Sequence, residues 1–318
     1  MTVADVFRYV SRNASNETYP VWGSQVWAVD VTNSTQPLVK AVLPVEGSVD
    51  QTRIVGDILY IVSKAGWWWS YYQDGQSSPQ TYVASYDISN PGQLTPVQRL
   101  DFVSTGYEYH ANVTTDRIIL STVNWDYTQN SGYGTQFTPI DISNPNGSLA
   151  LGKNFSAAGQ VDDRWSMDFD PSRSLFRAVL RNSWNNGGRL VLWNSPDVQT
   201  ATELATLEIT VQERITAASF DADRAYITTA LCSDPLWIVD THDTAHPQMR
   251  GSVHLPGAID LVIPRGDRLI GLGHNGTGCS SWSGSGQLSV TEFDVSNADQ
   301  PSLLSQVTFG EAYSQVNA

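Results

Sequence analysis

The stretch Thr81–Thr122, TYVASYDISNPGQLTPVQRLDFVSTGYEYHANVTTDRIILST, sets a pattern that the rest of the chain repeats. It contains four short runs of alternating apolar and polar residues, which begin near Tyr82, Val97, Tyr107 and Arg117. Alternation with a period of two is typical of half-buried β-strands, and the polar residues between the runs are typical of turns. The stretch therefore predicts a four-stranded antiparallel meander. One such sheet cannot bury both of its faces alone, so we expect copies of it to stack.

Two motifs mark the copies along the chain. The first is the Asp-x-Ser-Asn-Pro-like end of a strand, which is weak at Trp193–Pro196 and otherwise begins at Asp30, Asp87, Asp141, Asp240 and Asp294. The second is an apolar strand such as RIILST, whose copies end at Ser11, Ser63, Thr122, Leu180, Thr229 and Gly273. These end points lie 52, 59, 58, 49 and 44 residues apart, and the count from Gly273 past the C-terminus to Ser11 is 56. The chain therefore consists of six units.

The two ends of the chain belong to the same unit. The chain begins with the strand that ends at Ser11, and it finishes with the alternating run Ala312–Asn317. A C-terminal strand that completes the N-terminal sheet closes a ring and leaves no open sheet edge. We therefore predict an all-β fold, a six-bladed β-propeller of four-stranded antiparallel blades, in which blade one combines residues 1–45 with 310–318. Residues 1–318 are expected to form this single domain.

The composition excludes some classes of partner. The net charge of −14 argues against nucleic acid and anionic membrane surfaces, and no apolar run is long enough to span a membrane. Charged residues make up only 16% of the chain, Lys is scarce, and Asn, Ser, Thr, Gly, Trp and Tyr are abundant. This profile predicts a secreted or cell-surface (envelope) protein. Because residues 1–5 do not form a signal peptide, any targeting segment is expected outside this sequence.

The repeat also resembles a known group of proteins. The DISNP-type strand end at Asp87–Pro91, the Asp-Arg/Leu-Tyr-Ile turn and strand, and the unit length are similar to those of bacterial secreted or cell-surface β-propeller families with LVIVD-like repeats. The resemblance covers almost the whole chain. It implies the fold more than a function, because most members of these families have no assigned activity.

Aromatic residues gather in the loops that follow the apolar strands. Flat indole and phenol faces beside neutral polar side chains suit the stacking and hydrogen bonding of sugar rings, and Trp and Tyr also dominate protein interfaces. The alternative is that they pack loop against loop. Three consecutive tryptophans cannot all point into one core, so we expect at least one to be exposed or covered by another loop. The candidate ligand-binding residues are Trp22, Trp67, Trp68, Trp69, Tyr71, Trp125, Tyr127, Trp184 and Trp282.

Charged residues are expected on the innermost strands, which line the channel of a propeller. Paired carboxylates there could serve glycoside chemistry or bind a cation, although solvated strand ends carry such charges routinely. No nucleophile, zinc or phosphate-loop motif is present in the sequence, so we assign no catalytic residue, no metal ligand and no cofactor. A bound cation such as calcium is kept as an alternative. The candidates are Asp50, Glu108, His110, Asp162, Asp163, Arg164, Glu213, Arg214 and Asp260.

The two cysteines occupy equivalent positions in neighbouring units. Cys232 and Cys279 each follow the apolar strand of their unit, and neighbouring blades hold equivalent loops close together. We predict a disulfide between them in an oxidising compartment, the alternative being two free thiols.

Repeated aspartates are interpreted as structural. Asp and Asn cap turns by accepting hydrogen bonds from nearby backbone N–H groups, and proline ends a strand. We therefore expect the aspartate of each DISNP-like motif to shape a turn. The same role is expected for the aspartates that precede the apolar strands, namely Asp5, Asp57, Asp116, Asp223 and Asp267.

Together these features predict a non-catalytic extracellular or envelope module that presents an aromatic-rich loop rim to a glycan or a protein partner. One alternative is a rigid structural module of a larger surface protein, since termini that meet in one blade allow flanking domains on both sides. A second alternative is a carbohydrate-active enzyme that uses channel carboxylates.

Overall fold

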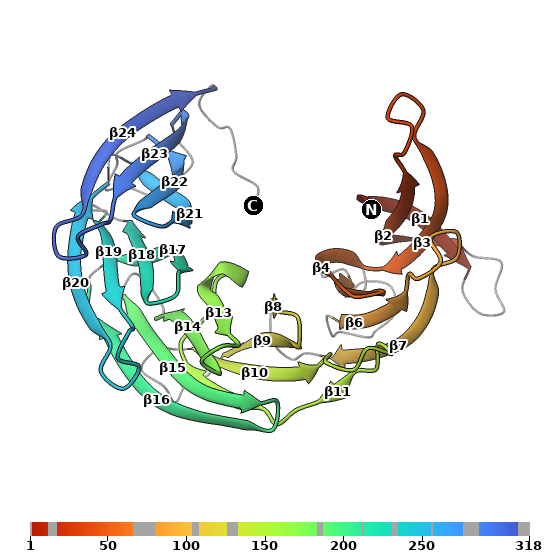
Figure 1. Ribbon diagram of the computed structural model, residues 1–318, viewed down its shortest axis with the longest axis horizontal. Helices are drawn as coiled ribbons and strands as arrows, with labels where there is room; N and C mark the ends of the chain where they lie inside the picture. The colour runs from red at the N-terminus through yellow and green to blue at the C-terminus, as the bar shows by residue number, and fades with distance from the viewer. Residues whose placement is uncertain are drawn as a thin grey trace. The chain divides into compact units, whose positions relative to one another are not determined.

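The computed structural model describes residues 2–11, 18–65, 80–103, 108–125, 133–182, 187–211, 213–230, 235–255, 257–275 and 286–310 (Figure 1). For several strand residues at the borders of these ranges, and for most residues before Gly23, only the backbone is described. The described chain is β-strand and turn, with one 3-10 helix, η1, at Arg164–Ser166. The predicted all-β class is therefore confirmed. No helix in these ranges has the length and hydrophobicity that crossing a membrane requires.

The chain divides into two compact units, one built from residues 1–124 and 137–154 and the other from 125–136 and 155–318. The first unit holds a three-stranded sheet, a four-stranded sheet and most of a five-stranded sheet. Their strands are β1 (Thr2–Ser11), β2 (Thr18–Asp30) and β3 (Leu38–Glu46); β4 (Ser48–Val55), β5 (Ile58–Ala65), β6 (Gln80–Asp87) and β7 (Thr95–Val103); and β8 (Glu108–Val113), β9 (Arg117–Trp125), β10 (Tyr133–Asp141), β11 (Ala150–Leu151) and β12 (Phe155–Ala158).

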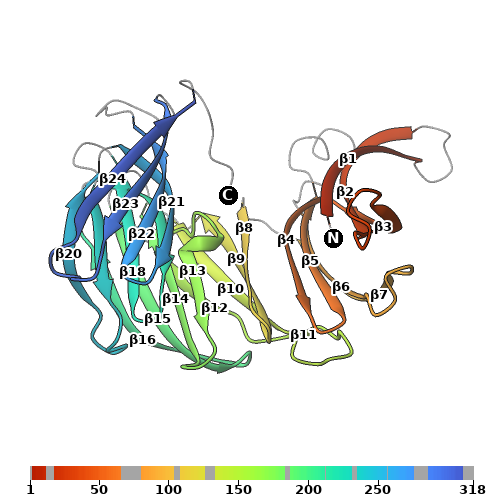
Figure 2. The same ribbon diagram turned by 45° about the horizontal axis from the view of Figure 1, so that its top comes forward.

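The second unit holds three four-stranded antiparallel sheets, each with its strands in chain order. The first consists of β13 (Met167–Asp170), β14 (Leu175–Arg181), β15 (Gly188–Asp197) and β16 (Thr200–Ile209). The second consists of β17 (Arg214–Phe220), β18 (Arg224–Ala230), β19 (Pro235–Asp240) and β20 (Gln248–His254). The third consists of β21 (Ala258–Arg265), β22 (Arg268–His274), β23 (Leu288–Asp294) and β24 (Ser302–Phe309), which lie side by side in Figure 2.

The sequence repeat and the sheets are out of phase. The stretch Thr81–Thr122 was expected to form one meander, but it supplies β6 and β7 to one sheet and β8 and β9 to the next. The expectation was wrong because alternation identifies strands without saying which connection is a hairpin and which crosses to another sheet. Residues 2–46 form the three-stranded sheet β1–β3. The predicted fourth strand, Ala312–Asn317, lies outside the described residues.

Apolar side chains from successive sheets form the core within each unit. In the first unit, Leu43 and Val45 of β3 cluster with Leu59 and Ile61 of the next sheet. In the second unit, Leu255 follows β20 and clusters with apolar residues of β21–β23. We expected the sheets to stack because one sheet cannot bury both of its faces alone. Neighbouring sheets inside each unit are stacked in this way.

The DISNP-like motif forms two consecutive turns closed by side chains. The Asp87 carboxylate accepts from the backbone N–H of Ser89 at 2.8 Å, and the Asn90 side chain accepts from that of Gly92 at 3.0 Å. The same pair of turns recurs at Asp30/Asn33, Asp141/Asn144, Asp240/Asp243 and Asp294/Asn297. This confirms the structural role predicted for these aspartates.

Two of these turn carboxylates, those of Asp30 and Asp294, are strongly stabilised in their ionised form. The hydroxyl and N–H of Ser296, then Arg268, lower the pKa of Asp294 to about 2. The N–H and hydroxyl of Thr32, then Lys40, lower the pKa of Asp30 to about 2. Hydrogen bonds that stabilise a carboxylate make its protonation costly, so the stability of these turns depends on pH.

A second recurring hydrogen bond ties four of these turns to the turn before the second strand. The N–H that follows the DISNP-type aspartate donates to a carbonyl in that earlier turn, as in Ile88 to Asp57 at 2.8 Å. The equivalent bonds run from Ile142 to Asp116, from Thr241 to Asp223 and from Val295 to Asp267. Asp57, Asp116, Asp223 and Asp267 therefore mark turns, as expected. The turn predicted at Asp5 is wrong, because Asp5 lies inside β1, where it pairs with Ser24.

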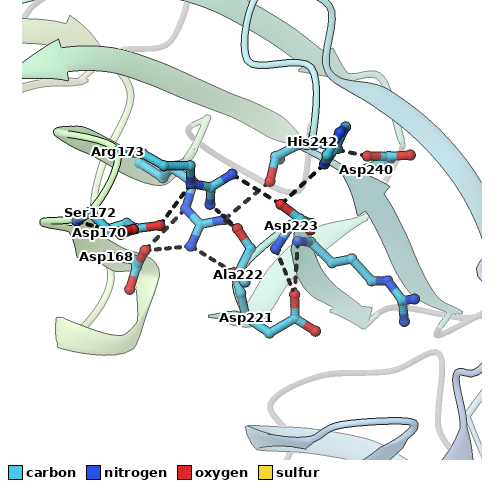
Figure 3. A network of polar contacts seen from close by, with 12 residues as sticks. Asp168, Asp170, Ser172, Arg173, Asp221, Ala222, Asp223, Asp240 and His242 are labelled. Atoms are coloured by element: carbon cyan, nitrogen blue, oxygen red, sulfur yellow. Dashed lines mark hydrogen bonds and ion pairs between the residues drawn. The ribbon is translucent and has the colours of Figure 1, made fainter.

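Arginines join the first two sheets of the second unit (Figure 3). Arg173, in the turn between β13 and β14, donates to Asp170 at 2.7 Å and to Asp223, in the β17–β18 turn, at 3.1 Å. It also donates to the carbonyl oxygen of Ala222. His242 lies 3.5 Å from the same Asp223 carboxylate. The β17–β18 turn thus accepts hydrogen bonds from an arginine of the preceding sheet. It also contacts His242, in the turn that follows β19 of its own sheet.

Candidate functional site

Each described sheet sends one connection from its second to its third strand. In the second unit these connections run from β14 to β15, from β18 to β19 and from β22 to β23. Between a second and a third strand in the sequence fall Trp67, Trp68, Trp69, Tyr71, Tyr127, Trp184 and Trp282, all of which lie outside the described residues. Trp22 and Trp125, which were also predicted in loops, belong instead to β2 and β9, and their side chains lie outside the described residues. Cys232 and Cys279, the predicted disulfide partners, also lie outside them.

The structure describes the strand ends from which these loops leave. At this end of the β4–β7 sheet, Asp50 of the first strand pairs with Lys64 near the end of the second strand, with 2.8 Å between carboxylate and ammonium. Asp50 occupies a β-bulge, since the register with β5 shifts between Val49 and Gln51. A bulge re-aims the side chain that it carries, and here it turns a carboxylate toward the base of the loop.

The first sheet of the second unit has an equivalent pair. Arg181, the last residue of β14, donates through Nε to Asp162 at 2.5 Å and through Nη2 to the side-chain oxygen of Gln160 at 2.9 Å. The backbones of Gln160 and Arg181 are also paired through two hydrogen bonds of 2.9 Å. The side chains of Asp162 and Arg181 are 21% and 15% exposed. The pair is therefore fixed by its neighbours and still reached by solvent.

The second sheet of this unit uses an uncharged partner. Glu213, which immediately precedes β17, is buried and accepts from the hydroxyl of Thr229 in β18 at 2.7 Å. The bulge in β17 lies at Thr216, whose hydroxyl contacts that of Thr228 at 3.0 Å. The Glu213 carboxylate thus lies at the end of the sheet from which the loop leaves, as in the other sheets, but here it is buried.

The third sheet pairs a carboxylate with a histidine. His274, the last residue of β22, is buried, and its Nδ1 lies 3.1 Å from Asp260 of β21. Asp260 occupies a bulge like that of Asp50. Burial raises the pKa of Asp260, and His274 opposes this rise. The Asp260–His274 pair thus occupies the end of the sheet from which the segment beyond Asn275 leaves.

The remaining inner-strand candidates have other surroundings. Asp163 caps η1 by accepting from the N–H and hydroxyl of Ser166 at 2.8 and 2.9 Å. Arg164 lies over the ring of Trp165, Arg214 is exposed on β17, and His110 is half-buried in β8. The side chain of Glu108 lies outside the described residues. Within the described ranges, no three His, Cys, Asp or Glu side chains are grouped as a metal site requires.

One aromatic residue at this end of the sheets was not among the candidates that the sequence offered. Trp165 of η1 is 40% exposed, and η1 directly precedes β13. It escaped notice because it lies in a charged segment rather than in a loop after an apolar strand. An aromatic residue inside a polar connection is itself a signal, and it could have been found by asking the same question of the connections between sheets.

Comparisons with known proteins agree with this architecture. The model of the family described as "Beta propeller domain" matches residues 69–318. A solved structure titled as a hypothetical selenium-binding protein from Sulfolobus tokodaii is 12% identical, covers 95% of this chain and 78% of its own, and has a TM-score of 0.55. A protein from Lactobacillus plantarum is 13% identical, covers 96% and 83%, and has a TM-score of 0.50. At these identities the likeness concerns the fold alone.

One curated relative matches a short segment. The uncharacterized protein MJ1554 of Methanocaldococcus jannaschii is 32% identical over 90 residues. The match spans 28% of this chain and 13% of that relative.

Proposed function

Because the chain belongs to the beta propeller domain family, we propose that it is a non-catalytic binding module whose loops between second and third strands hold a glycan or a protein partner. In this proposal the six sheets are the blades of one closed ring, and the segment after β24 completes the sheet of β1–β3. The module works outside the cell or in the envelope, as the composition suggests.

The outer strand β24 supports closure of the ring. Counted from the residue that pairs with the DISNP-type aspartate, Val307 and Phe309 of β24 correspond to Leu43 and Val45 of β3. Leu43 and Val45 are 8% and 4% exposed because the next sheet covers them. Val307 and Phe309 are 63% and 47% exposed. The last sheet thus has the apolar residues of a face that another sheet covers, but no described residue covers them.

The first sheet has a matching face on its other side. Val31 follows the aspartate of the first DISNP-like motif and is 66% exposed. The equivalent residues Ile142 and Val295 are 1% and 0% exposed, because each packs against the sheet before its own. A first sheet stacked on the last sheet would cover both faces in the way that every neighbouring pair inside the two units is covered.

One observation carries the binding proposal. In four sheets the carboxylate at the loop end is already paired across to the second strand, by Lys64, Arg181, Thr229 or His274. Paired groups of this kind fix the polar side chains at the strand ends from which the loops leave. A ligand that binds there would need to reorganise these side chains little. A general acid and base, in contrast, need carboxylates available to exchange protons with a substrate.

The aromatic residues of the loops favour a glycan as the first ligand to test. Trp67, Trp68 and Trp69 stand next to Ser70, Tyr71 and Tyr72, which supply hydroxyl groups beside stacking surfaces. Sugar rings need this combination of apolar faces and neutral hydrogen-bonding groups.

The test is binding of the purified protein to a broad glycan array, run with calcium and with a chelator. A variant with Trp67→Ala, Trp68→Ala and Trp69→Ala is compared with Val97→Ala, which removes an exposed apolar side chain from β7. We expect the triple variant to lose binding while Val97→Ala keeps it, with both retaining the thermal midpoint of the parent within a few degrees. A triple variant that binds normally overturns the assignment of the loops.

The other readings appear as distinct outcomes of the same experiment. Loss of stability without any glycan bound by the parent protein would favour a structural module. Turnover of a bound glycan would favour an enzyme. Capture of a protein partner that depends on the three tryptophans would place the ligand among proteins.

A further inference from the structure

An exposed aromatic ring and one partner of a fixed polar pair belong to one short segment at the start of the β13–β16 sheet. The segment from Gln160 to Trp165 contains Gln160 and Asp162, which Arg181 holds, and Trp165 three residues after Asp162. Met167 pairs with Ala178, so β13 begins where β14 ends. Trp165 and Arg181 therefore lie at the same end of the sheet. This is the end from which the loop containing Trp184 leaves.

Trp165 is exposed in a unit that buries another tryptophan completely. Trp193 is 2% exposed and packs against Phe155 and Phe176 with ring centroids 5.4 Å apart, whereas Trp165 is 40% exposed. A large apolar ring left open to water loses the free energy that burial would supply, about 25 cal/mol per Å². Packing of the core does not account for this residue at this position.

A cation holds the exposed ring in place. The guanidinium carbon of Arg164 lies 4.5 Å from the centroid of the Trp165 ring, within the range of a cation–π interaction. The 3-10 turn that carries both residues is capped by Asp163. The ring is therefore preorganised, which lowers the entropic cost of binding a ligand against it.

At the same end of the sheet, the polar groups combine donors and acceptors. Arg181 supplies N–H donors and Asp162 supplies carboxylate oxygens, while the buried Gln160 accepts from Arg181 and holds it in place. A single charge would select an ion of the opposite sign. Balanced donors and acceptors beside an aromatic face instead match a ring with hydroxyl groups on its edge and C–H groups on its face.

We infer that Trp165, Asp162, Arg181 and Gln160 form a carbohydrate subsite at the start of β13, with the sugar ring stacked on Trp165 and its hydroxyl groups bonded to the polar side chains. This inference rests on the proposed binding function and narrows its ligand to a glycan. It also assigns part of the recognition to the connection between sheets, outside the loops that the sequence identified.

The subsite is tested by calorimetric titration of the full chain with cellohexaose, chitohexaose and maltohexaose, together with the best ligand from the glycan array. We expect Trp165→Ala to raise the dissociation constant at least tenfold, which corresponds to a loss of about 1.4 kcal/mol of binding free energy. Trp165→Phe keeps an aromatic face and should lose less. Arg181→Gln should weaken binding several-fold, and Val97→Ala, at an exposed position on β7, should leave it unchanged.

The outcomes separate this inference from the proposed function. Wild-type affinity in Trp165→Ala, with binding lost in the Trp67/Trp68/Trp69 variant, overturns the subsite and leaves the loop proposal intact. Loss in Trp165→Ala alone supports the subsite and removes the loops. A parent protein that binds no oligosaccharide overturns the carbohydrate assignment, and the loop proposal is then decided by protein partners.

Discussion

The guanidinium of Arg177 in β14 donates to the hydroxyl of Thr241, which follows β19 in the next sheet, at 3.1 Å. Arg177 is only 2% exposed, and it also donates to the carbonyl oxygen of Asp221 at 2.7 Å and to Asp168 in its own sheet at 2.5 Å. The ring of Phe220 lies 4.9 Å from its guanidinium carbon. A single buried cation thus satisfies acceptors from two sheets and joins them.

Replacing this arginine should destabilise the second unit strongly. Arg177→Met keeps much of the volume but leaves several acceptors without their donor, and breaking a buried charged network typically costs about 3–5 kcal/mol. Because Asp168 is 31% exposed and can regain water, we expect the lower end of that range. Urea unfolding monitored by circular dichroism measures it. Arg214→Met, at an exposed position on β17, is the control and should cost less than about 0.5 kcal/mol. Equal stability of the two variants would contradict the assignment.

A glycine marks the contact between the last two sheets of the second unit. A Cβ added to Gly251 in β20 would lie 2.5 Å from the carbonyl oxygen of Ala298 and 2.7 Å from Pro301. Both neighbours belong to the turn before β24, and a backbone atom cannot rotate away. Gly251→Ala should therefore cost about 1–3 kcal/mol, measured as a lower midpoint of urea unfolding.

The control for this substitution is Gly266→Ala. Gly266 has a φ of +64° but has open space around the added atom. Its cost arises from backbone strain alone, about 1 kcal/mol. A Gly251→Ala variant as stable as the parent would show that the turn before β24 does not press on β20.

Acid should unfold the protein through its turns. The folded-state pKa values of Asp30 and Asp294 are lowered to about 2, below the value near 4 of an unfolded chain. Such groups contribute stability that is present above pH 4 and is lost as the pH falls through 2. We expect the urea midpoint to decrease steadily from pH 4 to pH 2. Asp294→Asn should flatten part of this slope while lowering stability at pH 7, and an unchanged slope would argue that other groups control acid unfolding.

Charges placed on β24 distinguish a closed ring from an open face. If the first sheet covers β24, Val307→Asp buries an unpaired carboxylate and should cost several kcal/mol. If that face stays in water, the change should cost less than about 0.5 kcal/mol. Leu255→Asp, at a position equivalent to Phe309 and 1% exposed, shows the cost of a covered site. We expect Val307→Asp and Phe309→Asp to approach Leu255→Asp in the midpoint of urea unfolding.

Much of the fold could be predicted from the sequence because its signals are local and repeated. Alternation gave the strands, and the Asp87–Pro91 motif gave the turns, whose hydrogen bonds involve neighbouring residues. The grouping of strands into sheets was misjudged at Thr81–Thr122, because the connection between β7 and β8 has no local feature that separates a hairpin from a crossing.

The candidate site could be predicted only in part. Asp50 and Asp260 lie on the first strands of their sheets, as expected, whereas Asp162 and Glu213 precede such strands. The partners of these four carboxylates, Lys64, Arg181, Thr229 and His274, were not predicted, because each pairing depends on the register and bulges of two strands. A one-residue shift in register would turn every one of these side chains to the opposite face.

The joints between sheets in the second unit are unequal, and this affects how the unit comes apart. Arg173 and the buried Arg177 tie the first sheet to the second through several acceptors. The second sheet is tied to the third by Arg224, which donates to the carbonyl oxygen of Val295 at 2.7 Å, and by Arg250, which donates to Asp299 through two bonds of 2.8 Å. The Asp299 side chain is 56% exposed, and an ion pair open to water adds little stability. In a stack of repeats, cooperativity is set by nearest-neighbour coupling. The β13–β20 pair should therefore behave as one foldon, and the amide protons of β21–β24 should exchange with deuterium at a lower opening free energy.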